Sequence, residues 1–126
     1  MVVATYDFAD QGKAQVMGGT ALSGFVKLIA DAHTGEILGA QAVGPEASDL
    51  IHELVAVITL RGTIEQFLKI PHIHPTLAEI WTYPAEEIVE VMRERSVVAR
   101  VTLMPGGYGP DEEESCVEAP AASRPE

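Results

Sequence analysis

The 126-residue sequence predicts an α+β domain in which a small antiparallel meander sheet is covered on one face by helices. Two observations support this prediction. Residues 24–30 and 37–43 are short β-rich runs, whereas residues 47–58 carry apolar side chains at the three- and four-residue spacing of a helix. With 47% hydrophobic residues, the chain can fill one core of ordinary domain size.

The two β-rich runs are expected to pair as an antiparallel hairpin. Between them, Asp31, Thr34 and Gly35 suit a tight connection that needs a positive φ. Gly39, inside the second run, favours a β-bulge or close backbone packing over contact with a ligand. Residues 13–18 are a candidate third strand.

The helix over residues 47–58 is predicted to be amphipathic, with chemical signals at both ends. Pro45 suits the start, and Gly62 follows the end at the position that favours a left-handed residue. His52 falls on the polar side, which favours an exposed histidine over a catalytic one. The buried face is expected to hold Ala47, Leu50, Ile51, Leu54, Val55 and Ile58.

Two later segments have the spacing of a capping box. Thr63 and Gln66 predict a short second helix that buries Ile64, Phe67 and Leu68. Thr76 and Glu79 repeat the spacing, which gives Glu79 a purely structural interpretation.

The segment HIHPTLAEIW concentrates the reactive side chains of the chain. His72 and His74 form an H-x-H pair that could begin a zinc site, although no third ligand is evident from spacing. Alternatively, His74 is an acid–base group whose tautomer is fixed by Glu79. A nucleophile to serve with it is missing, because Cys116 falls in the C-terminal tail and no serine lies in a nucleophile elbow.

Composition narrows the classes of partner. A formal net charge of −11 argues against nucleic-acid binding, which needs clustered lysine and arginine. The sequence lacks a long apolar run and a secretory signal, so we expect no membrane partner and a cytoplasmic location. Residues 105–126 are predicted to be a disordered acidic tail, and residues 1–104 the folded domain.

Residues 24–81 closely resemble the C-terminal dimerisation domain of the pyridine nucleotide-disulfide oxidoreductases. The motifs that carry the resemblance are G-F-x-K-L, I-L-G-A, G-x-x-A-x-x-L-I and H-P-T-x-x-E, in that order. The last motif is most similar to dihydrolipoamide dehydrogenases, with glutathione-reductase-like enzymes close behind. The resemblance implies a homodimer, or association with the flavin- and nucleotide-binding domains of the same enzyme.

The resemblance also implies roles for particular residues. His74 would serve the dithiol and flavin site of the partner subunit as acid–base group, Glu79 would orient it, and a cis peptide bond would precede Pro75. FAD and NAD(P) are implied for the full-length or partner enzyme and not for this chain, which lacks G-x-G-x-x-G and C-x-x-x-x-C motifs. The isolated chain is therefore not expected to turn over. A stand-alone dimeric interaction module without catalysis is the alternative.

Both ends depart from the family pattern. The usual opening phrase V-V-F-T-x-P-E and its helix are missing, so we expect an N-terminally incomplete domain whose sheet is one strand short. After the H-P-T segment the chain extends past the usual terminus. There Ile88, Val89 and Met92 have helical spacing, whereas residues 96–103 are a candidate strand that could cover the gap.

Overall fold

The sheet is built from three antiparallel strands in sequence order. A computed structural model describes residues 1–102 and 117–118, with the side chains of residues 1–96. The strands are β1 (Val2–Asp7), β2 (Phe25–Ala30) and β3 (Ile37–Val43), and β4 (Val117–Glu118) pairs in parallel with the start of β1. The resulting order is β3-β2-β1-β4, so the predicted α+β meander is confirmed.

The hairpin between β2 and β3 forms where the sequence predicted it. The Asp31 carboxylate accepts hydrogen bonds from the backbone amides of His33 and Thr34 at 2.9 and 2.8 Å, and Gly35 has a φ of 72°. The pairing then shifts from Ile29 opposite Gly39 to Ala30 opposite Ile37. Leu38 is therefore the extra residue of a bulge, as Gly39 predicted.

The prediction of a strand over residues 13–18 is wrong. These residues follow η1 (Phe8–Asp10) and form α1 (Gly12–Met17), after which comes η2 (Gly19–Leu22). The Gln11 side chain accepts from the Ala14 amide and so caps α1 at its start, while Gly18 ends it with a φ of 63°. The strand beside β2 is instead β1, which the sequence analysis did not identify.

The helix α2 (Ala47–Thr59) confirms the amphipathic prediction, with two corrections. Val55, expected on the buried face, is 49% exposed. The left-handed residue is Arg61, with a φ of 54°, and not Gly62. The amides of Arg61 and Gly62 donate to the carbonyls of Ile58 and Val57, both at 2.9 Å, which is the Schellman pattern. Gly62 is required for another reason, because an added Cβ would lie 2.6 Å from Val57 Cγ1.

The remaining helices are α3 (Ile64–Phe67), η3 (Ala78–Trp81) and α4 (Thr82–Thr102). The strand predicted over residues 96–103 is wrong, because α4 continues through Thr102. The Ser96 hydroxyl donates back to the Met92 carbonyl at 3.0 Å, one helical turn earlier. Strand propensity is a weak preference, and it does not interrupt a helix already under way.

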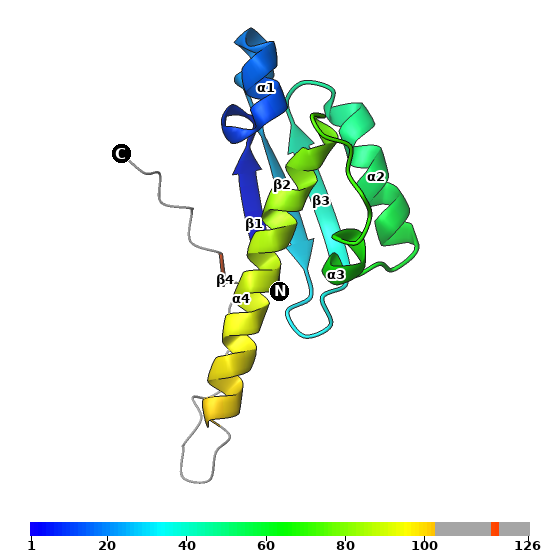
Figure 1. Cartoon of the computed structure of the whole chain (residues 1–126). Coiled ribbons are helices and arrows are strands. Elements are labelled where there is room, and N and C mark those ends of the chain that lie inside the picture. Colours follow the sequence, from blue (N-terminus) through cyan, green and yellow to red (C-terminus); the bar gives the residue numbers. More distant parts are fainter. Residues whose placement is uncertain (103–116, 119–126) are drawn as a thin grey trace, which may run out of the picture.

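The core lies between the sheet and its helices. Figure 1 shows α4 running across β1 and β2, and α2 alongside β3. Tight packing of large side chains on this face fixes the helices against the strands. The largest fully buried hydrophobic residues include Trp81, Phe8, Phe67, Leu28, Ile37, Leu54, Ile64, Ile80 and Ile88.

Some predictions fall outside this description. The proposed acidic tail, residues 105–126, lies outside the described residues except for Val117 and Glu118, and Cys116 lies outside them too. The domain limits of 1–104, with a missing N-terminal part, stay a prediction. Among the helices of the described residues, none has the length and apolar character needed to cross a membrane.

Candidate active site

His74 and Glu79 are brought together at one end of the molecule. The His74 Nδ1 atom lies 2.7 Å from Glu79 Oε1. The two side chains differ in exposure, since the imidazole is 83% exposed and the carboxylate only 14%. The peptide bond between His74 and Pro75 is cis, as the resemblance implied. The structure thus places an exposed ring on a nearly buried carboxylate.

The Glu79 carboxylate is held in its charged form. Desolvation acts to raise the pKa of Glu79, but hydrogen bonds from the Thr76 amide and the His74 ring outweigh it and hold the pKa below its ordinary value of 4.5. An ionised carboxylate can only accept hydrogen bonds, so Nδ1 of His74 carries the proton between them. The outward nitrogen, Nε2, is then the acceptor in the neutral ring.

The capping box predicted at Thr76 and Glu79 forms only in part. The Thr76 amide donates to Glu79 Oε2 at 3.2 Å, which is the carboxylate half of the box. The Thr76 hydroxyl does not complete it, because it donates to the Ile73 carbonyl at 2.7 Å. Leu77 is the residue that precedes η3, without a capping side chain. Glu79 therefore shares its two oxygens between the backbone and His74.

Two buried contacts fix the segment that carries the pair. The Trp81 indole is fully buried and donates to the Leu50 carbonyl in α2 at 3.0 Å. From the N-terminal part of the chain, the Gln11 amide donates to the Thr76 carbonyl at 2.7 Å. Gln11 could not be predicted as part of this site, because a glutamine before a short helix carries no signal for a contact 65 residues away.

His72 takes a different place from His74. Its Nε2 atom lies 3.0 Å from Glu53 Oε1, its side chain is only 9% exposed, and its ring meets Phe67 edge to face at 5.1 Å. The two histidines of the H-x-H segment thus face different carboxylates. Among the described residues, no group of three or more histidine, cysteine, aspartate or glutamate side chains could hold a metal ion.

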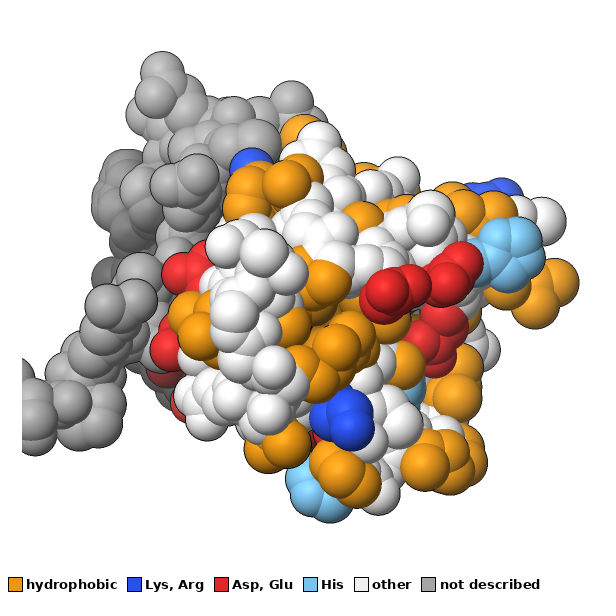
Figure 2. Space-filling view, turned by 90° about the horizontal axis from the view of Figure 1, so that it is seen from above, with side chains coloured by type: hydrophobic (Ala, Val, Ile, Leu, Met, Phe, Trp, Pro, Cys, Tyr) orange, Lys and Arg blue, Asp and Glu red, His pale blue; other side chains and the backbone are white. Residues whose placement is uncertain are grey.

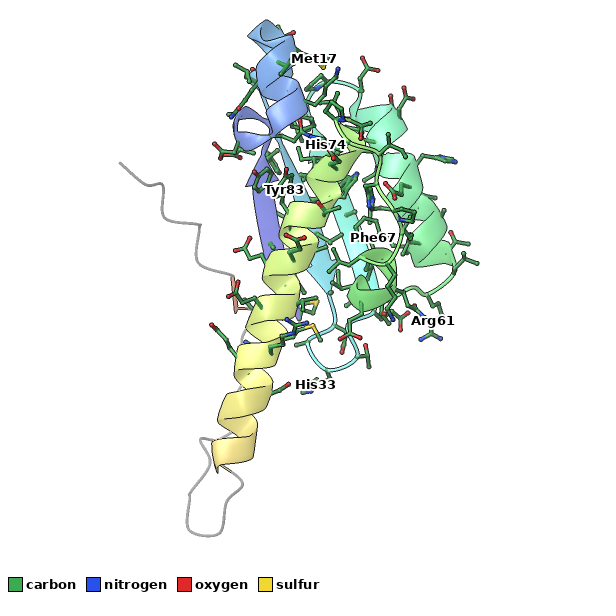
Figure 3. The ribbon with its side chains drawn as sticks, in the orientation of Figure 1. Met17, His33, Arg61, Phe67, His74 and Tyr83 are labelled. Carbon is green, nitrogen blue, oxygen red and sulfur yellow. The ribbon has the colours of Figure 1, made fainter. Side chains whose placement is uncertain are left out.

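His52 also behaves as the sequence predicted, since it is exposed on α2. Figure 3 shows that His74 and Met17 lie at one end of the molecule and His33 at the other. A cavity of about 550 Å³ lies at the His33 end, between the hairpin turn, α3 and α4. A second cavity, of about 450 Å³, is lined by His72, Glu79 and Tyr83, beneath the carboxylate of the pair.

Hydrophobic side chains are exposed at the His74 end. Ile73, beside His74, is 74% exposed, while Val16 and Met17 of α1 are 82% and 50% exposed and Leu22 of η2 is 38% exposed. Figure 2 views the molecule from this end and shows hydrophobic side chains gathered between acidic ones. Exposed apolar surface of this kind marks sites of association.

Comparison with known proteins identifies the family. Residues 1–85 match the family described as the pyridine nucleotide-disulphide oxidoreductase dimerisation domain. The chain belongs to this family. In the family, a dimerisation domain implies a homodimer, and the enzymes are FAD-dependent. The resemblance that the sequence motifs indicated is confirmed.

Several relatives of this chain are dihydrolipoyl dehydrogenases. That of Halobacterium salinarum is 44% identical over 85 residues, which are 68% of this chain and 18% of that protein. That of Corynebacterium glutamicum is 47% identical over 77 residues, or 61% of this chain and 16% of that protein. This dimerisation domain is therefore dihydrolipoyl dehydrogenase-like, but the chain spans less than a fifth of the length of these curated relatives.

A solved structure shares the fold. The HOCl-induced flavoprotein disulfide reductase RclA from Escherichia coli superposes with a TM-score of 0.61 over 67% of this chain and 19% of that chain. Its sequence is 23% identical to this one, so the likeness concerns the fold alone. The antiparallel strands β1, β2 and β3 with their packed helices thus form the architecture of this dimerisation domain in the described residues.

Proposed function

We propose that this dimerisation domain supplies His74 and Glu79 as an acid–base pair to the dithiol and flavin site of its partner subunit. The enzyme would be a flavin-dependent, NAD(P)-linked disulfide oxidoreductase acting on dihydrolipoyl groups. The observation that carries the proposal is the 2.7 Å contact between Nδ1 of a highly exposed His74 and Oε1 of a nearly buried Glu79. A histidine that only stabilised its own core would not expose its ring.

The orientation of the ring suits proton transfer outward. Glu79 accepts from Nδ1, which leaves Nε2 as the acceptor on the exposed side of the ring. A substrate thiol must lose its proton before its sulfur attacks a disulfide. His74 would take that proton at Nε2, and Glu79 would stabilise the imidazolium that results.

Other domains would supply the rest of the reaction. The flavin and a redox disulfide, held outside this chain, provide electron transfer, while His74 and Glu79 hold and move the proton. Ile73, next to His74 in the sequence, and Met17, which lies toward the same end of the molecule in Figure 3, are both exposed apolar residues and support a subunit contact at this end. His74 would then project from one subunit toward the site of the other.

The proposal is tested in a chimera in which this chain replaces the dimerisation domain of the Halobacterium salinarum dihydrolipoyl dehydrogenase. His74→Ala is expected to lower kcat by about 10²–10⁴-fold, the usual contribution of a positioned acid–base group. The matched control is His52→Ala, which removes an exposed histidine from α2 and should leave turnover unchanged. Both variants are compared by steady-state turnover and by unfolding temperature.

The outcome decides between two functions. A yellow dimer whose turnover depends on His74 supports the proposed role. A chimera that dimerises and binds flavin, yet works equally well with His74→Ala, would contradict it. The third outcome is a chain that purifies as a colourless homodimer, gives no turnover in the chimera, and dimerises equally well with His74→Ala. That outcome would identify the interaction module without catalysis.

A further inference from the structure

Gln11 is a polar side chain in an otherwise apolar interior. Among the described residues it is the one polar or charged residue classed as buried, with no exposed surface. Both the oxygen and the nitrogen of its side-chain amide form hydrogen bonds. Oε1 accepts from the Ala14 backbone amide at 2.8 Å, and Nε2 donates to the Thr76 carbonyl at 2.7 Å. A buried amide is stable only when both groups are satisfied.

Thr76 connects this glutamine to the His74 and Glu79 pair. Its carbonyl accepts from Gln11, and its own amide donates to Glu79 Oε2 at 3.2 Å. Glu79 Oε1 in turn holds Nδ1 of His74 at 2.7 Å. A continuous set of hydrogen bonds therefore runs from the start of α1, through one backbone residue, to the exposed imidazole.

We propose that Gln11 is a positioning residue that holds the orientation and tautomer of His74 through Thr76 and Glu79. The inference rests on the proposed role of His74. The side-chain hydrogen bonds of Gln11 go to the backbone of Ala14 and Thr76 and not to His74 or Glu79, so it would act through the backbone of Thr76. It joins the N-terminal segment to the turn that carries the pair, 65 residues later in the chain.

The chemistry of the glutamine side chain suits this task. The Thr76 carbonyl needs a donor and the Ala14 amide needs an acceptor, and a primary amide offers both in one plane. Without the donor, the Thr76 carbonyl would have to turn toward water to regain a partner. The carbonyl and the amide of Thr76 lie in the two peptide planes that meet at its Cα. A turn no longer anchored at the carbonyl is less fixed at the amide, so the hydrogen bond from the Thr76 amide to Glu79 Oε2 would weaken and loosen the carboxylate that holds His74.

Two variants separate positioning from the capping of α1. Gln11→Met keeps the volume but loses both hydrogen bonds. Gln11→Ser keeps a good capping acceptor for the Ala14 amide but is too short to reach Thr76. The matched control is Gln15→Met, because Gln15 also donates to a backbone carbonyl, that of Ala9 at 3.0 Å, and not to that of Thr76. Only the first two variants lose the bond to Thr76.

The readout is the tautomer of His74 in the full 126-residue chain, measured by ¹⁵N NMR of the ring nitrogens at a pH where the imidazole is neutral. In the unaltered chain we expect an excess of the form protonated at Nδ1. In Gln11→Met and Gln11→Ser the ratio should shift toward that of exposed His52, observed in the same spectrum. Gln15→Met should leave the ratio unchanged.

A second measurement covers the case in which Gln11→Met fails to fold. In the unaltered chain, a scalar coupling across the hydrogen bond should link Gln11 Nε2 to the Thr76 carbonyl carbon, and Gln11→Ser should still give the tautomer shift. The inference is overturned if the coupling is missing, or if a folded Gln11→Met or Gln11→Ser keeps the His74 ratio of the unaltered chain.

The result that would overturn the proposed function differs from the one that would overturn the role of Gln11. Turnover that does not depend on His74 in the chimera would remove the acid–base role, yet would leave the NMR result standing. Conversely, an unchanged His74 tautomer in the Gln11 variants would remove the positioning role while turnover still depended on His74. If both proposals hold, Gln11→Met in the chimera lowers kcat and changes KM by a smaller factor. Gln15→Met changes neither kcat nor KM.

Discussion

Two segments of this domain, Thr63 to Gln66 and Thr76 to Glu79, have the spacing of a capping box but form different hydrogen bonds. At Thr63 and Gln66 both reciprocal bonds form, since the Gln66 amide donates to the Thr63 hydroxyl at 3.3 Å and the Thr63 amide donates to the Gln66 side chain at 3.0 Å. At Thr76 and Glu79 only the carboxylate half forms, and the second carboxylate oxygen holds His74. The first box bonds only to the backbone of its own segment. In the second, the Thr76 hydroxyl bonds to the Ile73 carbonyl instead, and the spare oxygen of Glu79 contacts an exposed imidazole.

The anchoring aromatic side chains should make the largest difference to stability. Each box opens an element that ends in a fully buried aromatic residue, Phe67 for the first and Trp81 for the second. We expect Phe67→Ala and Trp81→Ala each to lower the free energy of unfolding by about 3–5 kcal/mol, measured by denaturant titration. Leu60→Ala, at a side chain 81% exposed, should change it by no more than about 0.5 kcal/mol. A small effect at Trp81 would mean that the His74 segment is not held by the core.

The next largest difference is expected in kcat, which should fall when the carboxylate of the second box is replaced and not when the glutamine of the first box is. In the chimera, Glu79→Gln replaces the carboxylate that holds Nδ1 of His74 and should lower kcat by about tenfold or more. Gln66→Ala removes the equivalent residue of the structural box and should leave kcat unchanged. Steady-state kinetics on both variants measures the contrast. Equal kcat values in Glu79→Gln and the unaltered chimera would show that the carboxylate serves only the backbone.

The two threonines should differ in the helix end that they protect. Thr63→Ala removes the hydroxyl that accepts from the Gln66 amide, and should cost about 1 kcal/mol while speeding hydrogen exchange at Gln66. Thr76→Ala removes a hydroxyl that bonds to the Ile73 carbonyl instead. It should leave exchange at the Glu79 amide unchanged. Faster exchange there would mean that the second box closes in solution.

The smallest expected effect is the acid response of the second box. The pKa of Glu79 is lowered in the folded chain, so its stabilising contribution is complete above its ordinary value of 4.5 and is lost as the pH falls through the lowered value. The groups that face it are His74, His72 and the Thr76 amide. Unfolding measured from about pH 6 to about pH 3 should show the difference between the unaltered chain and Glu79→Gln shrinking below pH 4.5.

The pH-dependent contributions of other carboxylates to stability cancel in that comparison. The pKa of Asp31, lowered by the amides of Thr34 and His33, and that of Glu36, lowered by Arg61, are the same in both proteins. Gln66 does not titrate, so Gln66→Ala should give a difference that does not vary with pH over the same range. A constant difference for Glu79→Gln as well would contradict the charged bond to His74.

The contrast between the two capping boxes also shows which parts of the fold could be predicted from the sequence. Local signals succeeded where neighbours in sequence decide the structure: the Asp31 turn, α2, and the Thr63 box that opens α3. They failed at residues 13–18, because the residue that caps this helix is Gln11, and glutamine is not among the usual N-cap residues. The strand β1 (Val2–Asp7) was also missed.

The contact between His74 and Glu79 could be predicted from the sequence, whereas the contacts that hold the two residues in place could not. The motif around His74 and Glu79 named the pair, but spacing alone could not say whether Glu79 served the backbone or the imidazole. That depends on the Thr76 hydroxyl turning to Ile73, on Gln11 reaching across 65 residues, and on Trp81 reaching α2. Contacts between distant segments are set by tertiary packing, which no local pattern encodes.

The claim that His74 serves the partner subunit is tested most directly by complementation in mixed dimers of the chimera. One subunit carries His74→Ala and an intact redox disulfide, while the other carries His74 and has its redox cysteines replaced by serine. Each homodimer should be inactive. The account predicts that the mixed dimer recovers turnover at the one site where an intact disulfide meets the partner's His74. A mixed dimer as inactive as either parent would contradict the account.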